Sequence, residues 1–331
     1  MIDVITIGGI TYDIFIKTPP LKTVKKDKGD MLCFDLGSKI LASDVQFSPG
    51  GGAGNTSVGL DKLGLNVLPL GMVGRDDIAD TVLNEFKKRK IDTSLIKKKS
   101  GLKTGLSVVL SSPDGERTVF MYRGANDKLK VKNDKLKIKN ARWLFVSHLS
   151  GESHECIKDL IEFTKENPKI KIAWNPGKTQ LVDGRWYIAS SMVRKFCKLA
   201  DALIVNRKEA ERIVQNSKLK VQSSDTESLE NALKSLGSRI VVITDGRNGA
   251  CVWSGRDDFK MPAYPAKKIS TLGAGDAFSS GFLTSMILNN EDVALSLKWG
   301  VINGAGVIEK YGAQNGLLTR REVERRLKGW K

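Results

Sequence analysis

The segment 270–282, STLGAGDAFSSGF, places a carboxylate directly after three small residues, where a helix is expected to begin. Gly273, Ala274 and Gly275 leave their backbone N–H groups free of bulky neighbours. A helix N-terminus attracts anions, because its first donors have no intrahelical acceptor. Asp276 beside such an anion site suits transfer of a phosphoryl group to an alcohol, since the hydroxyl must lose its proton as it attacks. Alternatively, Asp276 is only an N-terminal cap.

A second segment, SPGGGAGNTSVGLDKLG at 48–64, has three consecutive glycines before an apolar-periodic helix. Gly50, Gly51 and Gly52 are costly in backbone entropy unless the chain bends sharply or approaches a ligand closely. Asn55 stands at the start of the helix, where its amide could bind a hydroxyl or cap the helix. An ordinary glycine turn is the alternative. The chain contains neither the pattern GxxxxGK[ST] nor an HRD loop, which excludes two common phosphoryl-transfer sites.

The composition excludes several other classes of protein. The 331 residues are 40% hydrophobic, which is too apolar for a disordered chain and sufficient for a large α/β core. The formal charge of +17 would attract nucleic acid, an anionic membrane or an anionic small substrate. The cysteines and histidines lack metal-ligand spacing, so reduced thiols in a cytoplasm are expected. Neither a signal peptide nor a membrane span is apparent, and we expect a cytoplasmic protein.

Short β-branched runs alternate with amphipathic stretches along most of the chain. Helices are predicted over 55–63, 77–90, 153–166, 187–199, 207–216 and 226–236, and again after Gly273. A strand followed by a helix, repeated, predicts an α/β fold with a mostly parallel sheet covered by helices on both faces. Ligands of such sheets bind beyond the carboxyl ends of the strands. The functional residues should therefore directly follow strands.

Two segments, 14–47 and 105–123, break this alternation. Ile14 and Ile16 have strand-like spacing, and the second segment is typical of a hairpin with its turn at Ser112 to Gly115. Together they predict a small β-sheet that acts as a lid and excludes water from the chemistry. The predicted α/β domain, which binds nucleotide and substrate, consists of residues 1–13, 48–104 and 124–331.

Through these motifs the chain resembles the ribokinase-like (PfkB) carbohydrate kinase family. The first signature is matched by Gly50, Gly51, Asn55, Ser57, Gly64 and Gly74, and the second by Gly273, Ala274, Gly275 and Asp276. The matching elements follow one another in family order over nearly the whole chain. The resemblance implies the ribokinase-like fold and ATP-dependent phosphorylation of a hydroxyl on a small sugar, usually a primary hydroxyl, with Mg²⁺ as cofactor.

The resemblance also implies roles for residues around the acceptor. Asp276 is similar to the family's catalytic base, with Gly273, Ala274 and Gly275 as its anion hole. Asp13, in GGITYD, matches the substrate-binding aspartate that follows the first strand, and a carboxylate that accepts from two vicinal hydroxyls suits a sugar. Residues that would complete the sugar site are Gly50, Gly51, Gly52 and Asn55.

On the nucleotide side, Asn206 and Glu209 match the family's NxxE motif, which acts on Mg²⁺ and the phosphates largely through water. Asn206 also suits a helix cap, and the two roles are compatible. Thr244, Gly246 and Gly249 in TDGRNG resemble the TxGxxG nucleotide loop, for which a plain hairpin turn is the alternative. Two further positions match the nucleotide site: Asn175 near the phosphates, and Asn303 on the adenine side, or alternatively as a solvent-facing residue of a packed helix.

Two residues depart from the family pattern. Ser270 stands where members that respond to potassium usually carry aspartate, so a bound monovalent cation is doubtful and potassium should stimulate turnover little. Gly52 stands where ribokinase itself has lysine, which weakens that specific identity. His148 and His154 are interpreted as structural, because the family's chemistry needs no histidine.

The residues are compatible with substrates of several chemical classes. Arg123, beside Tyr122, would favour a carboxylate or phosphate on a sugar, unless it is a solvated lid residue. A nucleoside kinase is the second hypothesis, with an aromatic side chain stacked on the base. The candidates for this stacking are Phe15, Phe34 and Phe120, of which Phe15 should share a face with Asp13. The partners expected are a small molecule and a second copy through the lid, without nucleic acid or membrane; a non-catalytic nucleic-acid-binding protein is the remote alternative.

Overall fold

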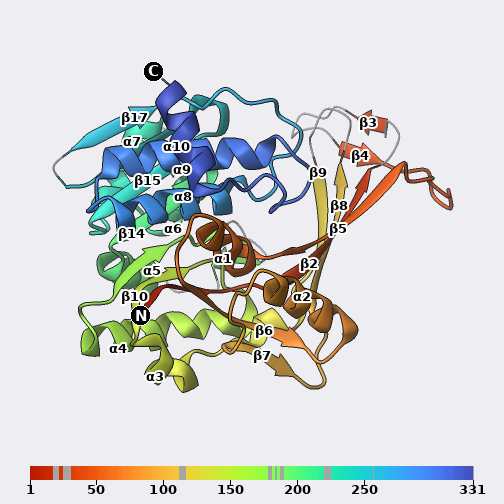
Figure 1. Ribbon diagram of the computed structural model, residues 1–331, viewed down its shortest axis with the longest axis horizontal. Coiled ribbons are helices and arrows are strands. Elements are labelled where there is room, and N and C mark those ends of the chain that lie inside the picture. Colours follow the sequence, from red (N-terminus) through yellow and green to blue (C-terminus); the bar gives the residue numbers. More distant parts are fainter. Residues whose placement is uncertain are drawn as a thin grey trace.

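The computed structural model describes residues 1–17, 22–24, 31–111, 117–177, 181–182, 185–186, 190–219, 225–255 and 257–330. Its centre is a nine-stranded sheet with the order β17-β16-β15-β14-β11-β10-β1-β6-β7 (Figure 1). The strands are β1 (Ile2–Ile7), β6 (Val67–Gly74), β7 (Ile96–Lys99), β10 (Ala141–Val146), β11 (Lys171–Trp174), β14 (Ala202–Asn206), β15 (Ile240–Thr244), β16 (Ala250–Trp253) and β17 (Asp258–Met261). All neighbours pair in parallel except β15 with β16 and β16 with β17. The predicted mostly parallel sheet is confirmed.

Helices cover both faces of this sheet, as the strand sequences require. Inner strands such as β10 and β15 are almost entirely apolar because their side chains alternate between two cores, whereas the edge strands β7 and β17 carry charged residues. Ile5 and Leu144 belong to one core, while Val4 and Phe145 belong to the other. The first core includes side chains of α4 (Cys156–Glu166), α5 (Ser190–Leu199), α6 (Arg207–Asn216) and α7 (Thr226–Lys234), and the second those of α1 (Gly52–Lys62), α8 (Ala274–Leu288) and α9 (Val293–Ile308).

The predicted helix 207–216 is confirmed at both ends as α6, and most of the other predicted helices are present with shifted ends. Residues 187–189 of the predicted helix 187–199 lie outside the described residues. α1 begins at Gly52, three residues before the predicted start, because the third glycine is already helical. The predicted helix 153–166 begins instead with a 3₁₀ turn, η3 (Gly151–Glu155). The remaining helices are α2 (Asp77–Lys88), α3 (Lys135–Ile138) and α10 (Arg320–Gly329), with short 3₁₀ turns η1 (Gly124–Lys128), η2 (Lys132–Asp134) and η4 (Gly246–Asn248). None of the helices in the described part of the chain is long and apolar enough to span a membrane.

A separate four-stranded sheet, which we call the lid sheet, stands at one side of the large sheet (Figure 1). Its order is β5 (Asp44–Gly50), β2 (Thr11–Lys17), β8 (Gly105–Ser111) and β9 (Arg117–Tyr122). The predicted hairpin pairs β8 with β9, while its predicted turn lies outside the described residues. Two short pairings complete the described strands: β3 (Lys22–Val24) with β4 (Met31–Cys33), and β12 (Leu181–Val182) with β13 (Arg185–Trp186).

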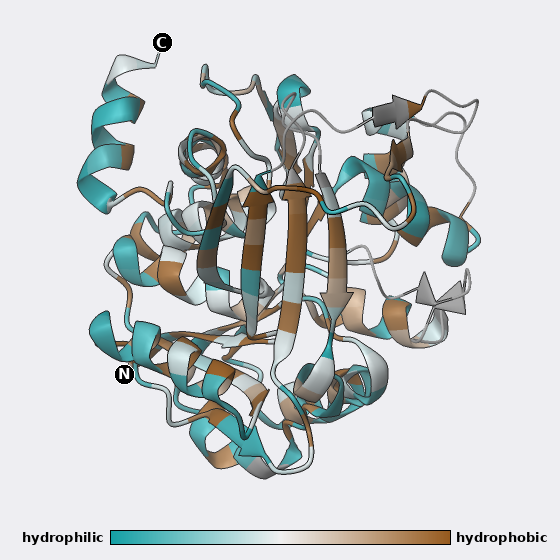
Figure 2. Ribbon diagram, turned by 90° about the vertical axis from the view of Figure 1, so that its right-hand side faces the viewer, coloured by the Kyte–Doolittle hydropathy of each residue, from teal (hydrophilic) through white to brown (hydrophobic). Residues whose placement is uncertain are grey.

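The two faces of the lid sheet differ because strand side chains alternate. Asp13 and Phe15 are buried on the inner face, whereas Phe47, Phe120 and Tyr122 lie on the outer face and are more than half exposed. Figure 2, which views the molecule from the lid side, shows these strands largely in the hydrophobic colours. The inner face therefore contributes to the site, and the outer face is an exposed apolar surface.

Candidate active site

The lid sheet carries one buried carboxylate, Asp13, in the middle of β2. Its neighbours across the sheet are Ser48 on β5 and Ser107 on β8. Thr11 donates its hydroxyl to Asp13 Oδ1 at 3.1 Å. Burial raises the pKa of Asp13 to about 6, although the Ser107 and Thr11 hydroxyls act against the rise. Asp13 is thus a carboxylate held by hydroxyl groups and available to accept hydrogen bonds from a polar ligand.

The glycine segment brings the backbone against this carboxylate. A Cβ added at Gly50 would lie 2.5 Å from Asp13 Cγ, so only glycine leaves room for the acid. Gly51 has a left-handed φ of 85°, and an added Cβ would lie 2.6 Å from the carbonyl carbon of Gly9. These glycines therefore allow β5 to lie close to Asp13 and to the loop after β1, while the predicted approach of a ligand stays a prediction.

Gly52, the first residue of α1, lies close to the N-terminal end of α8. A Cβ at this position would lie 2.9 Å from the side chain of Ser147 and 3.8 Å from Asp276 Oδ1. Ser147 directly follows β10 and is buried. Position 52 therefore lies between the carboxyl end of the large sheet and the carboxylate of Asp276.

Asp276 is the third residue of α8, and the cap of that helix is Gly273, with a left-handed φ of 79°. The interpretation of Asp276 as only a helix cap is therefore wrong. Its Oδ2 accepts a hydrogen bond of 2.8 Å from Asn55 Nδ2. Burial raises the pKa of Asp276 to about 7, the Asn55 amide opposes this rise, and the negative charges of Glu209 and Asp13 add to it. A carboxylate titrating near neutrality is suited to accept a proton.

The residues before Asp276 form the open end of α8. Gly275 is exposed, and a Cβ added there would meet no atom within 4 Å. At Gly273 an added Cβ would lie 2.6 Å from the Cβ of Ala313, so the turn needs glycine for its backbone conformation and for its packing. The amides of Ala274 and Gly275 belong to the first turn of the helix, where an anion is stabilised. The Ala274 N–H also donates a long hydrogen bond of 3.4 Å to the Thr271 carbonyl.

Asn206 and Glu209 form a capping box at the start of α6. Asn206 Oδ1 accepts from the Glu209 N–H at 3.0 Å, and the Asn206 N–H donates to Glu209 Oε2 at 3.0 Å. The cap expected at Asn206 is confirmed. Glu209 is buried and close enough to Asp276 to raise its pKa, so the motif lies at the same end of the sheet as the base.

The loop with Thr244, Gly246 and Gly249 joins β15 to β16 as an antiparallel hairpin. Both glycines have left-handed φ angles, of 54° and 88°. Gly249 is required by packing, because an added Cβ would lie 2.7 Å from the carbonyl carbon of Pro262, whereas Gly246 faces open space. Thr244 pairs in register with Asn206, so this hairpin lies beside the capping box.

The side chain of Asn303 is enclosed between α8, α9 and the segment before α10. It has no exposed surface. Its Nδ2 donates to the Ala277 carbonyl at 2.8 Å and to Ser280 Oγ at 3.1 Å, and its Oδ1 accepts from the Leu318 N–H at 3.1 Å. The expected contact with adenine and the alternative of a solvent-facing residue are both contradicted, because the amide is used inside the protein.

Arg123, at the end of the lid hairpin, approaches the loop after β10. Burial lowers the pKa of Arg123, so the interpretation as a fully solvated lid residue is wrong. Burial and the Arg123 charge lower the pKa of His148 to about 3. The Nδ1 of His148 lies 3.1 Å from the Pro176 carbonyl, next to the partly exposed Asn175. A neutral histidine and a guanidinium therefore line this side of the site.

The stacking candidates are divided between different surfaces. Phe15 shares the inner face with Asp13, as predicted, and is 4% exposed. Phe120 pairs with Val108 and lies on the outer face, away from Asp13. Phe34 is 44% exposed and lies outside the strands of the lid sheet. Of the three, only Phe15 is on the face that could adjoin a base.

Several polar residues of the site were not predicted from the sequence: Thr11, Ser107, Ser147 and Gln314. The period of two along β2 and β8 could have placed Thr11 and Ser107 on the face of Asp13. No sequence pattern could have predicted a role for Gln314, because it lies between α9 and α10 and its hydrogen-bond partners are remote in sequence. It donates to Asn55 Oδ1 at 3.0 Å.

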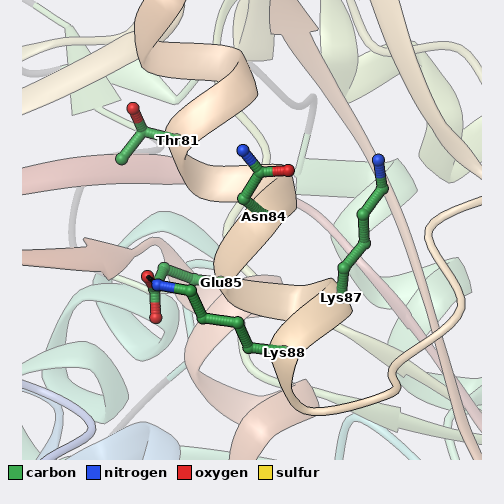
Figure 3. A pocket seen from close by; sticks show the side chains of 5 residues that line it. All are labelled: Thr81, Asn84, Glu85, Lys87 and Lys88. Carbon is green, nitrogen blue, oxygen red and sulfur yellow. Dashed lines mark hydrogen bonds and ion pairs between the residues drawn. The ribbon is translucent and has the colours of Figure 1, made fainter.

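A surface hollow on α2 lies apart from these residues. It is lined by Thr81, Asn84, Glu85, Lys87 and Lys88 (Figure 3). Lys88 reaches Glu85 at 2.6 Å, and Lys87 points away from this pair. All five side chains come from one helix, so they lack the convergence from several elements that a ligand site has.

Comparisons relate the chain to proteins of known name. Residues 25–320 match the pfkB family carbohydrate kinase. The ribokinase of Lactococcus lactis subsp. lactis (strain IL1403) is 26% identical over 333 residues, covering 99% of this chain and 98% of its own. The 5-dehydro-2-deoxygluconokinase of Clostridium botulinum (strain Eklund 17B / Type B) is 27% identical over 296 residues, covering 84% of both. The solved structure of Burkholderia thailandensis nucleoside kinase in complex with ADP-inosine superposes with a TM-score of 0.80 at 19% identity, covering 98% of this chain and 95% of that one.

Proposed function

Because the chain belongs to the pfkB family of carbohydrate kinases and is an ATP-dependent phosphotransferase, we propose that it phosphorylates a primary hydroxyl of a small sugar with Asp276 as base. The ribokinase-like fold expected from the sequence is confirmed by structural matches to ribokinases. The observation that carries the proposal is the meeting of Asp276, Asn55 and the glycine segment at the open end of α8.

In the proposed reaction the sugar hydroxyl lies beside the carboxylate of Asp276, and the transferring phosphoryl group lies at the amides of Ala274 and Gly275. Asp276 accepts the hydroxyl proton as the oxygen attacks the terminal phosphorus of ATP, and ADP leaves. The amides of Ala274 and Gly275 stabilise the negative charge on the transferring group. A base with a pKa of about 7 is about half ionised at neutral pH and is strong enough to take this proton.

The sugar is proposed to bind between the lid sheet and the glycine segment. Asp13 accepts hydrogen bonds from two vicinal hydroxyls, and Gly50 and Gly51 allow the ligand to approach the backbone. Asn55 contributes its amide on the side of Asp276. Arg123 is partly buried near the negative charge of Asp127, and its guanidinium favours an acceptor that also carries a carboxylate or phosphate, because it can bind either group through two hydrogen bonds.

A nucleoside acceptor is the weaker proposal. It shares the ribose contacts, but it needs an aromatic or apolar surface for the base. Only Phe15 among the three stacking candidates lies on the face of Asp13, and Phe15 is almost fully buried. The surroundings of Asp13 are instead hydroxyl groups, which favour a sugar.

The nucleotide is proposed to lie along the ends of β14 and β15. Thr244, Gly246 and Asn206 have open or polar surface there, and Asn175 is proposed to adjoin the phosphates. The described residues contain no cluster of three or more histidine, cysteine or acidic side chains that could hold a metal. A Mg²⁺ ion carried by the phosphates and water, with Glu209 as a nearby carboxylate, fits this arrangement and would neutralise phosphate charge.

The outer face of the lid sheet is proposed to bind a second copy of the chain. Ile14, Phe47, Val108 and Phe120 lie next to one another across its four strands, and the pairing registers place no charged residue among them. An exposed apolar surface of this kind marks an interface. A two-fold axis through this face would pair each copy's patch with the same patch of the other.

The proposed function is tested by ADP release from ATP and Mg²⁺ over a panel of sugars, sugar acids and nucleosides. We expect turnover with a sugar or sugar acid. Asp276→Asn should reduce this turnover by about 1,000-fold or more while ADP binding is retained. Near-normal activity of that variant would remove Asp276 from the role of base. Turnover confined to nucleosides would favour the second proposal.

A further inference from the structure

The amide of Gln314 occupies a fixed place behind the proposed base. Gln314 lies in the segment between α9 and α10 and is 4% exposed. Its Nε2 donates to the Pro49 carbonyl at 3.0 Å and to Asn55 Oδ1 at 3.0 Å. Both protons of this NH₂ group are therefore used, one toward β5 and one toward α1.

These bonds determine which way two amides point. The Pro49 carbonyl is a backbone acceptor and cannot exchange roles, so the group facing it must be the NH₂ of Gln314 rather than its oxygen. That NH₂ in turn requires an oxygen from Asn55. Asn55 is left with its own NH₂ directed at Asp276 Oδ2, at 2.8 Å. The Pro49 carbonyl therefore determines the orientation of the Gln314 amide, and the Gln314 amide determines that of the Asn55 amide, which donates to Asp276.

We propose that Gln314 is a positioning residue for phosphoryl transfer, holding the Asn55 amide in the one orientation that presents an N–H to the carboxylate of Asp276. This inference rests on the proposed function, in which Asp276 is the base. A hydrogen bond donated to the ionised carboxylate favours ionisation, whereas an amide oxygen at the same place would favour the protonated acid. Gln314 thereby biases Asp276 toward the state that can accept a proton.

Loss of the Gln314 donors allows Asn55 to rotate and present its oxygen. Gln314→Met keeps the length of the side chain and removes both donors. We expect the pKa of Asp276 to rise by about one unit, the size of effect that a hydrogen bond to a charged group supports. Activity should then fall by about five-fold at pH 7, where fewer Asp276 side chains are ionised, and should largely return at pH 9.

A purely structural role for Gln314 gives a different result. In that case the variant would lose thermal stability, and its activity would fall by the same factor at every pH. The matched control is Asn315→Ala, because Asn315 is exposed in the same segment and holds it through the Tyr311 carbonyl at 2.8 Å. This control should leave the pH profile unchanged.

The decisive measurement is a ¹³C NMR titration of the Asp276 carboxyl carbon in the wild type, Gln314→Met and Asn315→Ala, assigned with Asp276→Asn. An upward shift of the midpoint in Gln314→Met alone supports the proposal, and an unchanged midpoint overturns it. Gln314→Asn, whose shorter side chain cannot span both acceptors, serves if Gln314→Met does not fold, and is read in the same way. The titration needs no turnover, so it can be interpreted even if the proposed function is wrong. The proposed function is tested separately, by ADP release from the wild type and from Asp276→Asn.

Discussion

Replacing Gly50 with alanine tests whether the glycine segment exists to admit Asp13. The added Cβ would lie 2.5 Å from Asp13 Cγ and 2.8 Å from its Oδ1, whereas non-bonded carbons in contact are about 3.5–4.0 Å apart. Gly50 does not have a left-handed φ, so alanine introduces no backbone strain of its own. Asp13 must therefore move by about 1 Å. Because such a misplacement of a substrate-positioning group costs about 100-fold in rate, we expect kcat/KM to fall by about that factor.

The assay is ADP release with the accepted sugar, measured for Gly50→Ala, Asp13→Ala and the double variant. If the clash with Asp13 is the whole cause, Gly50→Ala should have almost no further effect once Asp13 has been truncated. Gly329→Ala is the control for a glycine replacement, since its added Cβ meets no atom within 4 Å. Wild-type activity in Gly50→Ala, or an equal loss in both backgrounds, would refute the reasoning.

The remaining predictions concern pH, ions and assembly. In the free enzyme kcat/KM should rise with pH through ionisations at about 6 for Asp13 and about 7 for Asp276, so a pH–rate profile that is flat from pH 5 to 9 would contradict the assignment. Burial raises the folded-state pKa of Asp276 above its ordinary 3.8, so the folded protein binds the proton more tightly and loses stability as pH rises from about 4 to about 7. Thermal melts should accordingly show Asp276→Asn gaining stability relative to the wild type over this range. Potassium should change turnover little, because position 270 is a buried serine; strong dependence on potassium in an ion series would overturn this. Sedimentation should show a dimer that Phe120→Glu converts to a monomer, and a monomeric wild type would exclude the lid interface.

Residues that act through local chemistry were predictable from the sequence. The position of Asp276 in the first turn of a helix follows from the order of small residues before it, and the Asn206 cap follows from a strand that ends at a helix. The two sides of the large sheet were predictable from uninterrupted apolar strands. These features depend on residues within a few positions of each other, which is the distance over which helix and strand periodicity acts.

The face of the lid sheet on which a residue lies could be predicted only within a single strand. Phe15 could be placed with Asp13 because the two residues share one strand and the period is two. Phe120 could not, because its face depends on the pairing of β2 with β8 and of β8 with β9, and a shift of either register by one residue would reverse it. The register places Phe120 and Tyr122 on the outer face, and with them the proposed surface for a second copy.

The fold class, the family resemblance and the two glycine-rich segments could be predicted from the sequence, because each depends on neighbouring residues. Contacts between distant groups depend on the tertiary structure. Asn55 and Asp276 are joined by a hydrogen bond across 221 positions, Gln314 orients that bond from a third segment, and Gly50 is glycine because Asp13 lies against it. Asn303 is likewise buried inside the protein rather than at the expected nucleotide site, because helix packing gives its amide three internal hydrogen-bond partners. Hydrogen bonds and steric exclusion act over a few ångströms in space, so they can be assigned only after the chain has been folded around them.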